Sequence, residues 1–130
     1  AKGAYIVSEA DGDRLDGIII ATGSEVSLAV EAQAKLKEKG LHVRVVSMPC
    51  RENFDALPEN EREAILPKAV RARLAVEAAH PMGWDRYVGE QGAVIGIEQF
   101  GASAPGGLLM KEYGFSVEHV VAKMEAICKK

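Results

Sequence analysis

The chain has 130 residues, of which 48% are hydrophobic, 27% charged and 5% aromatic. Its 16 basic and 19 acidic residues give a formal net charge of −3 and are mixed along the chain, whereas a nucleic-acid-binding surface requires clustered Lys and Arg. The longest apolar runs are far too short to span a bilayer, and the length is typical of one domain. We therefore expect a single domain over residues 1–130 that binds neither nucleic acid nor membrane.

Short apolar runs bounded by Gly, Pro and Asp predict five strands. They are residues 5–7, 17–21, 42–48, 73–77 and 93–97. Helical patterns lie between and after them, at 22–39, 51–57, 59–66, 84–88, after Pro105, and from Val117 onward. Thr22 and Glu25 have the spacing of a capping box, and Ser116 is the predicted cap of the last helix. Strands that alternate with helices predict a mainly parallel sheet with helices on both faces.

The cysteines and histidines are too scattered to predict a metal site. Cys50 and Cys128 are far apart in the chain, and His42, His80 and His119 lie in three separate segments. Two reduced thiols are typical of a cytoplasmic protein, so we expect cytoplasmic localisation without a disulfide.

Two small-residue turns form a candidate anion site. It consists of Thr22, Gly23, Ser24, Gly101 and Ser103. Both turns follow predicted parallel strands and should meet at one edge of the sheet, where backbone amides at a helix start favour an anion. The alternative is that Thr22 and Ser24 only cap their helix and that the glycines allow tight turns. The loop has neither the glycines of a dinucleotide fingerprint nor the lysine of a phosphate loop.

A family resemblance is carried by short stretches along the chain: Ala21–Val26, Val46–Pro49, Val76–Ala78, Trp84 with Tyr87–Gly89, Phe100–Pro105 and Glu112–Phe115. These stretches resemble the C-terminal domain of transketolase. The resemblance runs from about Gly3 to Lys123 and implies a three-layer α/β sandwich. Its five-stranded sheet would be mostly parallel, with the first strand antiparallel and helices on both faces. The resemblance also implies that the chain is a fragment of a longer one.

Transketolase transfers a two-carbon ketol unit between sugar phosphates with thiamine diphosphate. In this family the cofactor, a divalent metal (Mg or Ca) and the catalytic groups belong to the two preceding domains, at the dimer interface, and none of their motifs occurs here. The resemblance thus implies that this chain alone holds no catalytic residue, cofactor or metal and is inactive. Its implied role is structural: to pack on the preceding domains of the same chain and support a homodimer.

Two other interpretations remain open. One is a free-standing small-anion or nucleotide-binding α/β module that uses the Gly23 and Gly101 turns. The other is the equivalent domain of a different thiamine-dependent enzyme, such as a 2-oxo acid dehydrogenase subunit or a deoxyxylulose phosphate synthase. The residue sequence of Phe100–Pro105 favours transketolase among these enzymes.

The candidate interface residues are Arg71, Arg73 and Trp84. With Lys68, the two arginines form the densest basic patch, and they point to the same face if their segment is extended. A solvated rim, an ion pair, a phosphate clamp and a contact with a neighbouring domain are the alternatives for this patch. Trp84, the only tryptophan, suits either core packing or an interface.

Overall fold

The computed structural model describes residues 3–23, 25–77, 83–96 and 116–129. They contain a five-stranded sheet of order β1-β3-β2-β4-β5. Its strands are β1 (Tyr5–Ser8), β2 (Gly17–Ala21), β3 (Val43–Ser47), β4 (Arg73–Glu77) and β5 (Ala93–Gly96). β1 pairs antiparallel with β3, and the other three pairs are parallel. The predicted mixed sheet with an antiparallel first strand is therefore confirmed.

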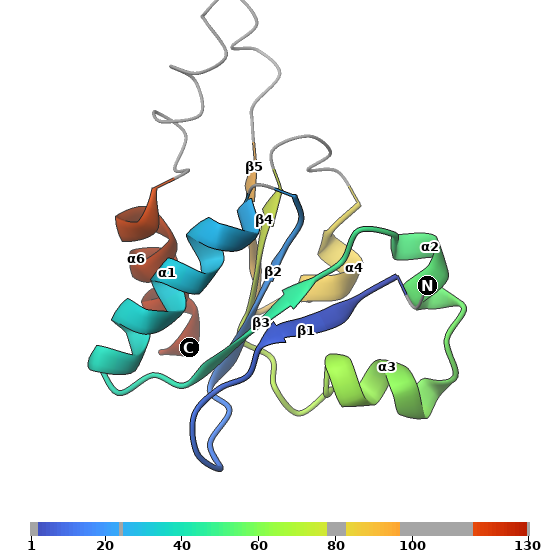
Figure 1. The fold of residues 1–130 in the computed structure, drawn as a ribbon, viewed down its shortest axis with the longest axis horizontal. Coiled ribbons are helices and arrows are strands. Elements are labelled where there is room, and N and C mark those ends of the chain that lie inside the picture. Colours follow the sequence, from blue (N-terminus) through green and yellow to red (C-terminus); the bar gives the residue numbers. More distant parts are fainter. Residues whose placement is uncertain (1–2, 24, 78–82, 97–115, 130) are drawn as a thin grey trace, which may run out of the picture.

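Helices cover both faces of this sheet and make three layers (Figure 1). On one face lie α1 (Glu25–Glu38) and α6 (Val117–Cys128). On the other lie α2 (Arg51–Asp55), α3 (Glu59–Ile65) and α4 (Asp85–Val88). Among the described residues, no helix has the length and apolar character needed to cross a membrane.

The central strand β2 divides the hydrophobic core in two. Ile19 faces α1 and α6 and packs in a cluster with Leu36 and Met124. Ile18 and Ile20 face the opposite way and pack in the second cluster, toward α2, α3 and α4. All three isoleucines are fully buried, and each such burial stabilises the fold by roughly 1.5–3 kcal/mol. β2 has a core cluster on each face, which explains why residues 17–21 do not alternate between apolar and polar side chains.

Most element boundaries agree with the prediction to within two residues, but the start of α1 does not. The helix begins at Glu25, whose backbone N–H donates to the Thr22 carbonyl at 3.1 Å. The predicted capping box at Thr22 is wrong, because the helix begins three residues later, at Glu25; the Thr22 hydroxyl donates to Glu77. The predicted cap at Ser116 is confirmed, since its hydroxyl accepts from the His119 N–H at 3.1 Å. The helix predicted after Pro105 lies outside the described residues.

Candidate functional site

A partly buried hydrogen bond joins two of the parallel strands at their carboxyl edge. Because Ala21 and Val76 are paired across β2 and β4, the residues that follow them, Thr22 and Glu77, come close together. The Thr22 hydroxyl donates to Glu77 Oε1 at 2.5 Å. Glu77 is only 6% exposed, and Glu25, at the start of α1, is 7% exposed. Two buried carboxyl groups therefore belong to this edge of the sheet.

Only part of the candidate anion site lies among the described residues. Gly23 has a φ of 56°, in the left-handed region that favours glycine, so the expected tight turn is present. Ser24, Gly101 and Ser103 lie outside the described residues. The Thr22 hydroxyl proton is already used by Glu77, and the carboxyl groups at this edge would oppose a nearby anion. The anion site stays a prediction, and this local chemistry disfavours it.

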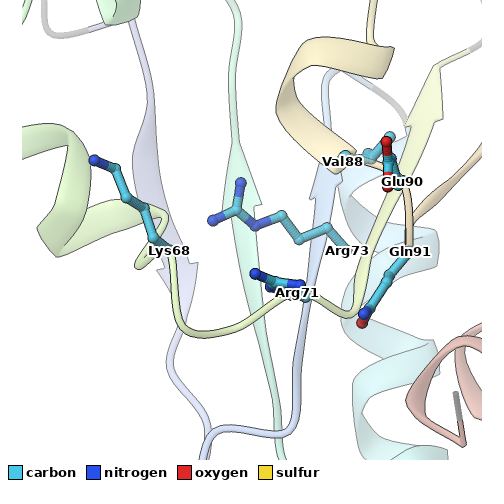
Figure 2. A pocket seen from close by; sticks show the side chains of 7 residues that line it. Lys68, Arg71, Arg73, Val88, Glu90 and Gln91 are labelled. Atoms are coloured by element: carbon cyan, nitrogen blue, oxygen red, sulfur yellow. The ribbon is translucent and has the colours of Figure 1, made fainter.

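The predicted basic patch lines a hollow of about 340 Å³ at the opposite edge of the sheet. Its walls are Lys68, Arg71, Arg73 and the segment from Val88 to Gln91, which precedes β5. In Figure 2 the two arginines lie between Lys68 and the loop that carries Gln91. Arg73 is the first residue of β4 and is half-buried, whereas Arg71 precedes the strand and is exposed.

Arg73 ties three segments of backbone together. Its Nε donates to the Val70 carbonyl at 3.0 Å, and its Nη1 donates to the Tyr87 carbonyl at 2.8 Å. Its Nη2 donates to the carbonyls of Leu66 and Pro67, at 3.2 and 2.8 Å. Burial lowers the pKa of Arg73, and nearby Glu63 partly opposes this shift. A guanidinium has five N–H donors, so few are left for a ligand.

Arg71 and Lys68 have a different environment from Arg73. Within the described part of the chain, Arg71 makes no hydrogen bond or ion pair, and its side chain is exposed. Lys68 forms an exposed ion pair with Glu59, with 3.6 Å between Nζ and Oε2. Exposed pairs of this kind contribute at most about 1 kcal/mol. In the described residues Arg71 lies at a solvated rim, and its contact with a phosphate or a neighbouring domain stays a prediction. The internal role of Arg73 was not among the alternatives drawn from the sequence.

Trp84 packs in the core on the α4 side. It is 2% exposed, and its ring centroid lies 5.6 Å from that of Tyr87. The Arg51 guanidinium carbon lies 5.1 Å from the Trp84 ring centroid, which is within the range of a cation–π contact. This environment fits the core-packing alternative, because so little of the Trp84 side chain is available to a partner.

The structure also shows a polar cluster that the sequence analysis missed. The Tyr87 hydroxyl lies 2.9 and 3.0 Å from the two carboxylate oxygens of Asp55, to which it donates. Arg86 Nη2 lies 3.1 Å from Asp55 Oδ2. Burial, followed by the hydrogen bond to Asp55, raises the pKa of Tyr87 to about 12. The Tyr87 phenol is thus protonated at neutral pH, so it donates a hydrogen bond and does not act as a base. The residues come from α2 and α4, and nothing in their spacing indicates this contact.

The described residues therefore define a class: a three-layer α/β domain whose half-buried and buried polar groups mainly hold its own fold. Its family follows from comparison with known proteins. A family model described as the transketolase-like TK C-terminal domain matches residues 3–116. The chain belongs to this family.

Transketolases from several organisms are similar to the whole chain. It is 49% identical over 129 residues to transketolase from Geobacillus stearothermophilus, covering 99% of this chain and 19% of that protein. It is 55% identical over 116 residues to that of Streptococcus pyogenes, covering 89% and 16%. The structure of transketolase from Leishmania mexicana matches with a TM-score of 0.83 and 47% identity, over 98% of this chain and 18% of that one. The chain thus spans about a fifth of the length of these relatives.

Proposed function

We propose that residues 1–130 form the C-terminal domain of a transketolase and that the domain has a structural role, packing on the preceding domains and supporting the homodimer. One observation carries this proposal: proteins named transketolase match nearly the whole chain, yet the chain spans only 19% of the Geobacillus stearothermophilus protein. The parent protein would transfer a two-carbon ketol unit between sugar phosphates in the cytoplasm. The domain alone would be inactive.

Thiamine diphosphate and its divalent metal would bind to other parts of the parent. A hard divalent metal that holds a diphosphate requires clustered oxygen ligands. Among the residues that the structure describes, no three His, Cys, Asp or Glu side chains gather into such a group. The assignment of the cofactor and its metal to the preceding domains follows from the family resemblance.

Catalytic inactivity is tested by separating the domain from its parent. The 130-residue chain, mixed with thiamine diphosphate, magnesium and sugar-phosphate donor and acceptor, should give no ketol transfer, whereas the full-length parent should be active. Measurable turnover by the isolated chain would overturn the proposal.

The structural role is tested by removing the domain from the full-length parent. The truncated parent should unfold at a lower temperature and dissociate to monomers at a higher protein concentration, because the surface on which the domain packs is left uncovered. Thermal unfolding and light scattering measure these two properties. A truncated parent that keeps both its stability and its dimer would refute the structural role.

A further inference from the structure

Three consecutive apolar side chains on β1 are uncovered. Tyr5 is 57% exposed, and Ile6 and Val7 are each 37% exposed. No other large hydrophobic side chain in the described part of the chain is exposed. β1, dark blue in Figure 1, is an edge strand that pairs only with β3 among the described strands. We call the side chains of Tyr5, Ile6 and Val7 the β1 surface.

The register shows that the β1 surface extends over both faces of the sheet. Tyr5 pairs with Ser47 and Ile6 pairs with Val46, so these neighbours lie on opposite faces. Ile6 shares the face of Val46, which packs in the core cluster next to α2 and α3. Tyr5 is on the α1 face but is not covered by that helix. Both faces are therefore open at the beginning of β1.

A bulge separates this open part of β1 from a covered part. The pairing shifts between Ile6 and Ser8, so Val7 lies in the irregular segment. Ser8 is tied to α1, since its hydroxyl donates to Gln33 Oε1 at 2.7 Å. Bulges on edge strands disfavour the addition of another strand. The exposed side chains are thus better suited to packing against a folded surface than to edge-to-edge pairing with a second copy.

The path of the chain next to the β1 surface indicates which protein covers it. The Gly3 carbonyl accepts from the Cys50 N–H at 3.1 Å, and a Cβ at Gly3 would overlap the Cys50 carbonyl. The backbone two residues before Tyr5 is therefore fixed against α2. The chain matches the C-terminal domain family of transketolases. In the Geobacillus stearothermophilus relative, about four-fifths of the protein lies outside the matched part. The preceding polypeptide of such a parent is held beside Tyr5, at a high effective concentration.

We propose that the β1 surface is where the domain docks onto the preceding part of its own transketolase chain. This inference rests on the proposed function, and it adds the surface that makes the contact. Contacts between domains of one chain typically bury 600–1,500 Å², so Tyr5, Ile6 and Val7 form the apolar centre of a larger interface. Covering them removes from water the exposed large hydrophobic side chains of the described residues.

Cysteine labelling of the full-length parent tests the proposal. Tyr5→Cys and Ile6→Cys report on the β1 surface, and Asp13→Cys, at an exposed position in the turn after β1, is the matched control. Each variant reacts with N-ethylmaleimide under native conditions and again in urea, and peptide mass spectrometry gives the ratio of the two rates. Positions 5 and 6 lie on opposite faces of the sheet. If one of these two variants fails to fold, the other still tests the proposal.

We expect cysteines at positions 5 and 6 to be protected at least about tenfold more than the cysteine at position 13. Equal labelling of all three would overturn the proposal. Protection that disappears on dilution to monomers would also overturn it, because a second copy would then cover the surface. If labelling is equal while removal of the domain still destabilises the parent, only the docking surface is wrong and the proposed structural role remains.

Discussion

Replacing Arg73 with lysine should destabilise the fold far more than a charge-conserving change at a hydrophilic residue usually does. The guanidinium reaches the carbonyls of Leu66, Pro67, Val70 and Tyr87 from three nitrogen atoms. A lysine has one nitrogen with three donors and a different reach, so it can satisfy about two of the four carbonyls. A single side chain would then no longer connect the end of α3, the segment before β4 and the end of α4.

The expected loss is about 2–3 kcal/mol in the free energy of unfolding. A hydrogen bond from a charged donor contributes roughly 1.5–3 kcal/mol when it is measured singly. Two lost bonds do not add fully, because the released carbonyls can be hydrated and Arg73 itself loses solvation when it is buried. Since a domain is typically stable by only about 5–15 kcal/mol, the change is a large share of the total.

Urea unfolding of the Arg73→Lys and Arg71→Lys variants measures this difference. Arg71→Lys is the matched control, because it makes the same chemical change two positions away at an exposed side chain. We expect its effect to stay within about 0.5 kcal/mol. Equal effects of the two substitutions, or a loss below about 0.5 kcal/mol at Arg73, would refute the assignment of Arg73 as a tie between backbone segments.

Two further predictions concern the partly buried polar contacts. Thr22→Val removes the hydroxyl donor to Glu77 and should cost about 1–2 kcal/mol in urea unfolding, while Thr22→Ser should retain most of the stability; equal losses would contradict a role for the hydroxyl. The fold raises the pKa of Tyr87 from 10.0 to about 12, so it favours the neutral phenol. The resulting stabilisation is fully present below pH 10 and is lost between pH 10 and 12, by at most about 2.7 kcal/mol. Tyr87→Phe should remove this pH dependence, and a variant that keeps it would show that another group titrates.

The sequence predicted the elements whose signals are local. The apolar run Gly17–Ala21 indicated a central strand, and the serine before Val117 indicated a helix start, because burial on both faces and capping each depend on a few adjacent residues. The antiparallel direction of the first strand came from the family resemblance and not from the residues. That direction depends on how Tyr5–Ser8 pairs with β3, which adjacent residues do not encode.

The polar contacts could not be predicted, because they join segments that meet only in the folded chain. The donors of Arg73 reach the end of α4, and Tyr87 reaches Asp55 in α2. The capping-box spacing predicted a helix that begins right after Thr22, but the helix begins at Glu25. The adjacency of β2 and β4 places Glu77 where it accepts the hydroxyl proton of Thr22. Local spacing is a poor guide where a strand neighbour offers a buried acceptor.

The two candidate contact surfaces of the domain differ in what a partner would gain by covering them. Arg71 is hydrated, so a partner would have to supply an acceptor to offset its desolvation, and Arg73 already spends most of its donors on backbone carbonyls. The β1 surface carries no charge, so only the Tyr5 hydroxyl needs a hydrogen-bond partner there. Covering the exposed parts of Tyr5, Ile6 and Val7 contributes roughly 1 kcal/mol for each side chain. The hydrophobic term therefore favours an interface centred on β1 over one centred on the basic hollow.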